Sequence, residues 1–151
     1  MNRSTAREIA VHFAFELAFS DERAQQVLDR ELTEEAFAAR GREEPLYAEF
    51  PGGGEREYIT RLVLGVGGHG AELDGYIDKY AKGWKFCRID RVATAIMRVT
   101  MYEILYMPDI PNKVAINEAV EIAKKYMDDD VVKFINGILG SFVRSEVPEQ
   151  E

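Results

Sequence analysis

Residues 89–108 read IDRVATAIMRVTMYEILYMP and carry the clearest helical pattern in the chain. That spacing of apolar residues places one group of side chains on a single face of an α-helix, with more polar residues between them. The aliphatic members of this face are Ile89, Val92, Ile96, Val99 and Ile104. Because proline cannot continue a regular helix, the helix is predicted to end before Pro108.

Helical spacing continues towards the C-terminus. Residues 107–111 contain two prolines and predict a short turn. A helix that carries Val114 and Ile122 is predicted to follow, and a last helix is predicted to run from about Asp129 past Phe142.

The N-terminal segment also has helical spacing. A hydroxyl at Ser4 or Thr5 followed by Glu8 resembles a capping box and predicts the start of a first helix, which ends near Phe19. No segment of the chain alternates polar and apolar residues with the period of a strand. The fold class is therefore predicted to be all-α.

Between these ends, glycine and proline divide the helices. A second helix, capped by Asp21, is predicted to end before Gly41, and residues 41–54, with two prolines and four glycines, are predicted to form a loop. From Glu55 helical spacing resumes, but residues 65–70 contain four glycines. Each interior glycine costs about 1 kcal/mol relative to alanine. A kink or two separate helices are therefore expected there.

Length and composition limit the classes to which this protein can belong. A chain of 151 residues forms one domain or two small helical halves. No apolar run approaches the roughly 20 residues that span a bilayer, and the N-terminus lacks a secretory signal, so a cytoplasmic protein without membrane contact is expected. One cysteine and two histidines exclude an internal disulfide and argue against a structural zinc site.

The charge is unevenly distributed. The net charge of -8 argues against non-specific attraction to polyanions, and the acidic excess concentrates in residues 29–57. Basic residues gather later in the chain, at Lys79, Lys82, Lys85, Arg88, Arg91 and Arg98. They predict either a local basic face or simply the solvated flanks of helices, and the sequence leaves both interpretations open.

Catalytic and cofactor motifs are lacking. His12 and His69 lie far apart, and nothing pairs either with Cys87 as nucleophile and base. The glycines of residues 65–70 lack the preceding strand and the Lys-Ser/Thr ending of a phosphate loop. The acidic run at residues 128–130 suits the positive end of a helix better than a cation site. The chain is therefore predicted to be no enzyme and to hold neither metal nor cofactor.

Three ordered segments resemble one known family. Residues 84–103, WKFCRIDRVATAIMRVTMYE, residues 111–124, PNKVAINEAVEIAK, and residues 133–139, KFINGIL, are similar to the most recognisable segments of the NusB transcription antitermination factors. The resemblance implies two stacked helical bundles, residues 1–82 and 83–151, that form one compact domain. At their glycine-marked junction, Trp84 is expected to be buried.

The resemblance also implies a function. NusB-like proteins bind the boxA element of nascent ribosomal RNA together with the ribosomal protein NusE, and they join the transcription elongation complex through other Nus factors. The residues that match RNA-proximal positions of the family are Phe15, Asp130, Lys133 and Phe134, and Arg3 and Arg7 near the start of the first helix are expected to contact phosphates. Phenylalanine would stack on bases and the carboxylate would accept from exocyclic amines, while core packing is the other interpretation open for Phe15.

A second function remains open from the sequence. An acidic helical scaffold would dock a basic ribosomal protein by charge complementarity and bind little RNA of its own. The apolar helical faces are compatible with a monomer and with a homodimer.

Overall fold

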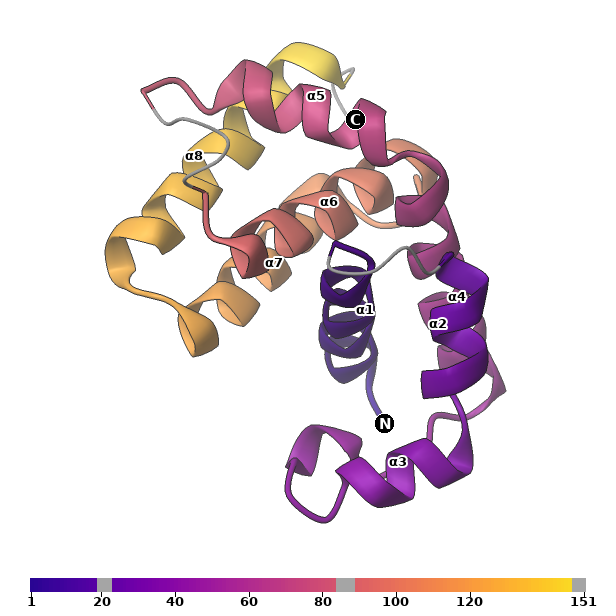
Figure 1. Cartoon of the computed structure of the whole chain (residues 1–151). Helices are drawn as coiled ribbons and strands as arrows, with labels where there is room; N and C mark the ends of the chain where they lie inside the picture. The colour runs from indigo at the N-terminus through magenta and orange to yellow at the C-terminus, as the bar shows by residue number, and fades with distance from the viewer. Residues whose placement is uncertain (19–22, 84–88, 148–151) are drawn as a thin grey trace. The chain divides into compact units, whose positions relative to one another are not determined.

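The computed structural model describes residues 1–18, 23–83 and 89–147, and every regular element in these ranges is a helix (Figure 1). The prediction of an all-α fold is confirmed. The helices are α1 (Arg3–Leu17), α2 (Ala24–Glu31), α3 (Glu34–Arg40), the 3-10 helix η1 (Pro45–Tyr47), α4 (Gly53–Gly68), α5 (Gly70–Tyr80), α6 (Arg91–Tyr106), α7 (Asn112–Tyr126) and α8 (Asp129–Glu146).

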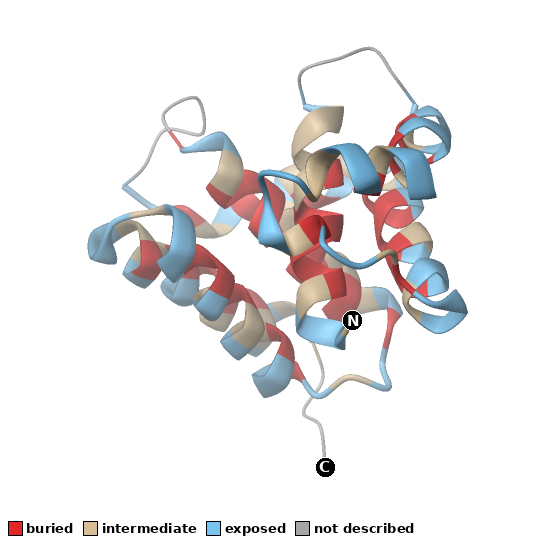
Figure 2. Ribbon diagram, turned by 90° about the horizontal axis from the view of Figure 1, so that it is seen from below, coloured by how far each residue is buried: buried red, intermediate tan, exposed pale blue. Residues whose placement is uncertain are grey.

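The chain divides into two compact units, Met1–Gly68 and His69–Glu151. In the first unit, α1 packs mainly against α4 and also against α2. Ile9 and Phe13 on the apolar face of α1 and Ile59 of α4 are all fully buried. Figure 2 shows buried and exposed positions along the same helices, as expected when each helix turns one face to a core.

In the second unit, α7 packs against both α6 and α8, and α5 packs against α6 and α8. A bidentate ion pair between Arg98 of α6 and Asp74 of α5, with N–O distances of 2.7 and 2.8 Å, joins two of these helices. By its contacts α5 belongs to the second unit, whereas the boundary predicted from the sequence follows residue 82. Apolar periodicity shows that a helix has a buried face but not which helix covers that face.

Two helix starts differ from the prediction. Asn2, rather than Ser4 or Thr5, caps α1, because its side-chain oxygen accepts from the backbone N–H of Thr5 at 2.8 Å. The predicted second helix is also two helices. The first of them, α2, ends at Glu31, and Thr33 then caps α3 because its hydroxyl accepts from the backbone N–H of Ala36. Asn and Thr are both good caps, and the sequence analysis overlooked their positions.

The glycine-rich segments behave largely as expected. The prediction of a kink or two helices near residues 65–70 is confirmed, since α4 ends at Gly68 and α5 begins at Gly70. The predicted loop over residues 41–54 is shorter than expected. It contains the 3-10 turn η1, whose Tyr47 is buried, and α4 already begins at Gly53.

Gly41 is required by a close backbone approach. A Cβ atom at this position would lie 2.8 Å from the carbonyl oxygen of Tyr47 and 2.9 Å from that of Phe37. Replacement of Gly41 by Ala is expected to lower the free energy of unfolding by about 1–3 kcal/mol, the usual cost of overpacking. Chemical denaturation measures the effect.

Gly75 provides the opposite control. It lies inside α5, and a Cβ atom there would meet nothing within 4 Å. Replacement by Ala should therefore raise stability by about 0.5–1 kcal/mol through helix propensity alone. Equal effects at Gly41 and Gly75 would contradict the close approach at Gly41.

Several sequence predictions lie outside the described residues. They concern the end of the first helix at Phe19, the cap at Asp21, the burial of Trp84, and the side chains of Lys85, Cys87 and Arg88. Within the described ranges, no helix is both long enough and apolar enough to cross a membrane.

Candidate nucleic-acid interface

Arg3 is at the N-terminal end of α1, on the surface of the first unit. Its guanidinium forms an ion pair with Glu55 at 2.9 Å and lies 4.0 Å from the centre of the Tyr58 ring. Half of the Arg3 side chain remains exposed. An incoming phosphate would therefore compete with Glu55 for a cation that is already oriented by an aromatic ring.

Arg7 lies one turn further along α1 and is only 3% exposed. Its guanidinium is 5.6 Å from the centre of the same Tyr58 ring. The register of α1 turns this position towards α4, so Arg7 contributes to the packing between the two helices. A phosphate could reach Arg7 only after the side chains around it move.

Phe15 is near the C-terminal end of α1 and is half-buried. A helix rises about 1.5 Å per residue, so Phe15 lies about 18 Å along the axis from Arg3. The two residues therefore belong to a long strip along α1 rather than to one small site. A base could stack only on the exposed part of the Phe15 ring.

Asp130, Lys133 and Phe134 occupy the first two turns of α8. Their spacing of three and four residues places them on one face of the helix. Asp130 and Lys133 are exposed, and Phe134 is half-buried. The structure thus brings together a carboxylate, an amine and an aromatic edge, which together can contact bases and phosphates.

The six predicted residues fall into two groups. Arg3, Arg7 and Phe15 belong to the first unit, and the other three belong to the second. Their combination into one RNA-binding surface remains a prediction.

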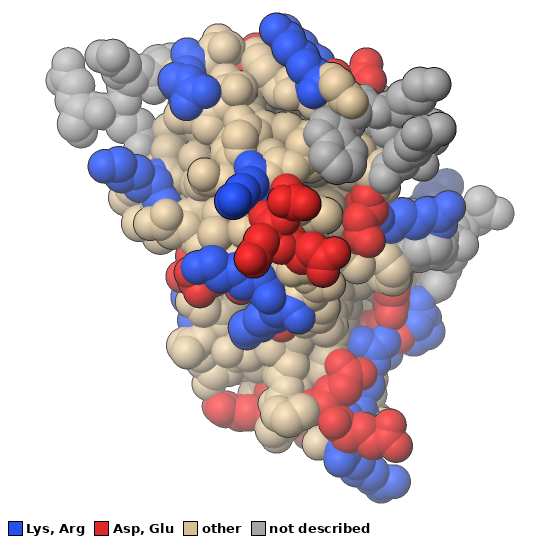
Figure 3. All heavy atoms as spheres, turned by 90° about the vertical axis from the view of Figure 1, so that its left-hand side faces the viewer, with Lys and Arg blue, Asp and Glu red and all other residues tan. Residues whose placement is uncertain are grey.

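The cations that predicted a local basic face are partly paired with carboxylates. Lys79 forms an ion pair with Glu146 at 2.7 Å, and Arg98 pairs with Asp74. Figure 3 likewise shows basic and acidic side chains interspersed on the face it presents. Lys85 and Arg88 lie outside the described residues, so the local basic face remains a prediction.

A polar network in the first unit was missed by the sequence analysis. Arg40 of α3 donates to the hydroxyl of Tyr47 at 2.9 Å and forms ion pairs with Glu16 of α1 at 2.9 Å and Glu31 of α2 at 3.0 Å. His12 of α1 lies 2.9 Å from the same hydroxyl through Nδ1. The sequence offers no signal for this network, because its members come from separate elements that only tertiary packing brings together.

The hydroxyl proton of Tyr47 determines the direction of the hydrogen bonds in this network. Its hydroxyl accepts from Arg40 and keeps one proton, which it can donate to Nδ1 of a neutral His12. Burial lowers the pKa of His12 below its ordinary value, against the opposing effect of Glu8 and other carboxylates. The folded protein therefore favours the neutral imidazole that this hydrogen bond requires.

The free energy of unfolding should depend on pH through His12. Because the folded pKa is lowered, the unfolded chain binds the proton more readily than the folded chain. The stabilisation is complete above the ordinary histidine pKa of about 6.5 and is lost as pH falls towards the folded value. Urea denaturation between pH 7.5 and 5.5 should show this loss. H12Q, which keeps an acceptor but does not titrate, should remove that part of the pH dependence, and an unchanged profile in H12Q would refute it.

Metal binding finds no support in the described parts of the chain, where no group of three or more His, Cys, Asp or Glu side chains is placed to hold an ion.

The sequence profile of the NusB family matches residues 4–144. The chain belongs to the NusB family. The antitermination protein NusB of Acetivibrio thermocellus is 38% identical over 144 residues, which cover 95% of this chain and 90% of that protein. NusB of Agathobacter rectalis is 40% identical over 146 residues, with 94% and 99% covered. The solved structure of T. maritima NusB has a TM-score of 0.81 and 28% identity, and the match covers 98% of this chain and 94% of that one.

Both of these relatives are named as transcription antitermination proteins. Two of the segments that carry the resemblance can now be placed on the fold. Residues 111–124 form most of α7, and residues 133–139 lie within α8, directly beside Asp130.

Proposed function

We propose that this NusB-family protein binds the boxA element of nascent ribosomal RNA jointly with NusE and so promotes processive antitermination in the cytoplasm. The observation that carries the proposal is the exposed face at the start of α8. There, a family-matching segment presents Asp130 and Lys133 beside the half-buried Phe134. Within the elongation complex, other Nus factors would be the further partners.

Each side chain of this face has a distinct task. Lys133 would neutralise a phosphate, which adds affinity without reading sequence. Asp130 would accept hydrogen bonds from exocyclic amines of bases, and Phe134 would offer its exposed edge for stacking. Arg3 and Phe15 on α1 would add a phosphate contact and a second stacking platform. None of these tasks requires a chemical step, in keeping with a binding factor rather than an enzyme.

The net charge of -8 favours a role for the protein partner. A strongly acidic protein gains little from non-specific attraction to RNA, whereas a basic ribosomal protein is steered towards it. NusE is therefore expected to supply part of the positive surface that holds the RNA.

Titration of labelled boxA RNA, with and without NusE and at stated salt concentrations, tests the proposal. Anisotropy should show tighter binding of boxA than of a scrambled RNA, and NusE should tighten it further. By linkage, boxA must then tighten NusE binding by the same factor. Equal binding of boxA and scrambled RNA in the presence of NusE would reject the assignment as an RNA reader.

Lys133 offers a sharper test of the α8 face. K133A is expected to weaken binding to all RNAs alike and to reduce the slope of log K against log salt by about 0.7–1, the value for one lost phosphate contact. Lys113 provides the control. It is exposed at the start of α7, whereas Lys133 lies on α8, which follows the other end of α7. K113A should leave affinity and slope unchanged. Identical slopes for K133A and the wild-type protein would remove Lys133 from the interface.

The second candidate function is an acidic scaffold that docks NusE and binds little RNA itself. The observation in its favour is the run of exposed glutamates around α3 and η1, at Glu34, Glu35, Glu43, Glu44 and Glu49. On this view, the protein shows no preference for boxA over other RNA, and K133A leaves the affinity for NusE unchanged.

A further inference from the structure

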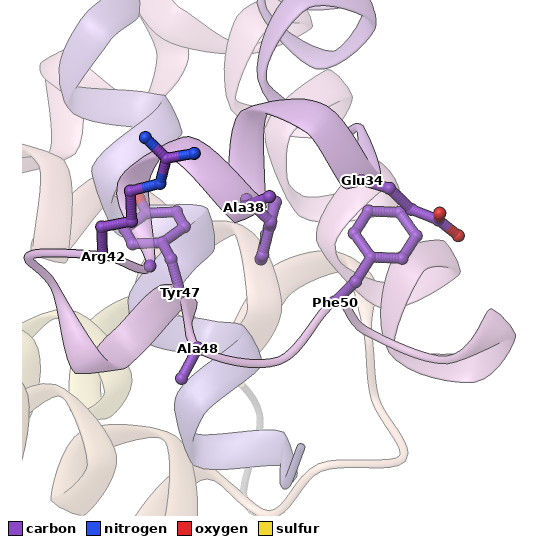
Figure 4. A pocket seen from close by; sticks show the side chains of 8 residues that line it. Glu34, Ala38, Arg42, Tyr47, Ala48 and Phe50 are labelled. Carbon is purple, nitrogen blue, oxygen red and sulfur yellow. The ribbon is translucent and has the colours of Figure 1, made fainter.

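A surface cavity lies within the first unit, between α3 and the segment that follows it. It has a volume of about 520 Å³. Aromatic side chains from Phe37, Tyr47 and Phe50 form its walls, and small residues leave its centre open. Figure 4 shows Arg42 and Tyr47 at one end, Glu34 and Phe50 at the other, and Ala38 between them.

The walls of this cavity are held in place before any partner binds. The Phe37 ring packs edge-on against the rings of Tyr47 and Phe50, with centroid distances of 5.0 and 5.2 Å. The Tyr47 hydroxyl is fixed by hydrogen bonds to Arg40 and His12. A preformed apolar cavity loses little conformational entropy when a side chain enters it.

The surroundings of the cavity are acidic. Five exposed glutamates lie on α3 and in the turns before and after η1, at Glu34, Glu35, Glu43, Glu44 and Glu49, and Arg42 is the one basic residue among those that line the cavity. Glu49 also receives the chain's N-terminal ammonium group at 2.8 Å, so this region already attracts one cation. A polyanion such as RNA is repelled here, and a cationic segment is attracted.

We propose that this cavity is a docking site for a basic protein segment that places one large apolar side chain in the space lined by Phe37, Tyr47 and Phe50. Lysine or arginine residues on either side of the inserted residue would pair with the surrounding glutamates. The apolar anchor supplies affinity by leaving water, and the flanking charges supply orientation and rate of association. The inference rests on the second candidate function, since it uses the same glutamates, and it does not depend on boxA binding.

Peptides of defined composition test the docking site. The probe is Ac-KRKFKRK-NH2, titrated into the ¹⁵N-labelled protein and followed by NMR chemical shifts at low salt. Shifts should concentrate on residues 34–50. A peptide with serine in place of phenylalanine should bind at least about tenfold more weakly, because it lacks the buried ring. A peptide with glutamate in place of each lysine and arginine should not bind.

Matched variants locate the site. A38W fills the cavity and should weaken binding of the phenylalanine peptide at least about tenfold, the loss expected when the ring can no longer be buried. Ala39 is exposed on the same helix but does not line the cavity, so A39W should bind like the wild-type protein. E34Q removes one of the surrounding charges without altering shape and should weaken binding of the phenylalanine peptide at low salt.

Several results would overturn the proposal. Equal affinities for the phenylalanine and serine peptides would show charge attraction without an apolar anchor. Equal behaviour of A38W and A39W, or no binding at millimolar peptide, would show that the cavity is not the site. Shifts in residues 34–50 on addition of a single-stranded RNA would assign the surface to nucleic acid instead. Failure of these tests leaves the boxA titrations unaffected, so the two proposals stand or fall separately.

Discussion

Replacement of Arg40 by Ala is expected to lower the free energy of unfolding by about 2–3 kcal/mol, because it breaks a charged network that packing has largely removed from water. One guanidinium joins three elements here, through Glu16 of α1, Glu31 of α2 and Tyr47 of η1. Without it, the 9% exposed side chain of Glu31 loses one of its partners.

Two features limit this loss. The Arg40 side chain is itself 29% exposed, which reduces the cost of an unpaired charge. Arg30 also contacts both Glu31 and Glu16, the latter at 3.6 Å, and can compensate in part. The expected loss is therefore smaller than that of a fully buried ion pair.

Arg42 provides the control for Arg40, since it is exposed and lies two residues further along. R42A should change stability by less than about 0.5 kcal/mol. Urea denaturation measures the stability of both variants. R40K keeps the positive charge but loses the several N–H donors of the guanidinium, so it separates the effect of the hydrogen bonds from that of the charge. Equal stabilities of R40A and R42A would show that the network contributes nothing.

Replacement of Phe142 by Ala should have the largest effect on the second unit, a loss of about 3–5 kcal/mol. Phe142 of α8 is fully buried, and its ring packs edge-on against Tyr76 of α5 at 5.1 Å. It also meets Tyr80 at 6.4 Å. Truncation would leave a cavity and remove two aromatic contacts that hold α5 against α8.

Hydrogen exchange locates this effect. Amide protection of α5 should fall first in F142A, because α5 loses aromatic contacts of both tyrosines, whereas F142L keeps most of the volume and should lose less stability. Unchanged protection of α5 in F142A would contradict the packing of α5 with α8.

The helical class of this protein follows from local sequence. Apolar spacing within residues 89–108 and the breakers at residues 107–111 act over one or two helical turns, so α6 and α7 were predictable from the chain alone. The family follows from sequence for a similar reason, since its motifs are short, ordered segments, and residues 111–124 and 133–139 fall almost entirely in α7 and α8. The same holds for Asp130, Lys133 and Phe134, which share one face through helix geometry alone.

Tertiary structure alone established the rest. Arg3 and Arg7 are one turn apart on the same face of α1, yet Arg3 is half-exposed and Arg7 is buried, because Arg3 lies at the end of the helix whereas Arg7 lies within its packing against α4. The network around Arg40 and the cavity beside Phe37 depend on side chains from separate elements. Their interactions require a three-dimensional arrangement that the period of a single helix does not encode.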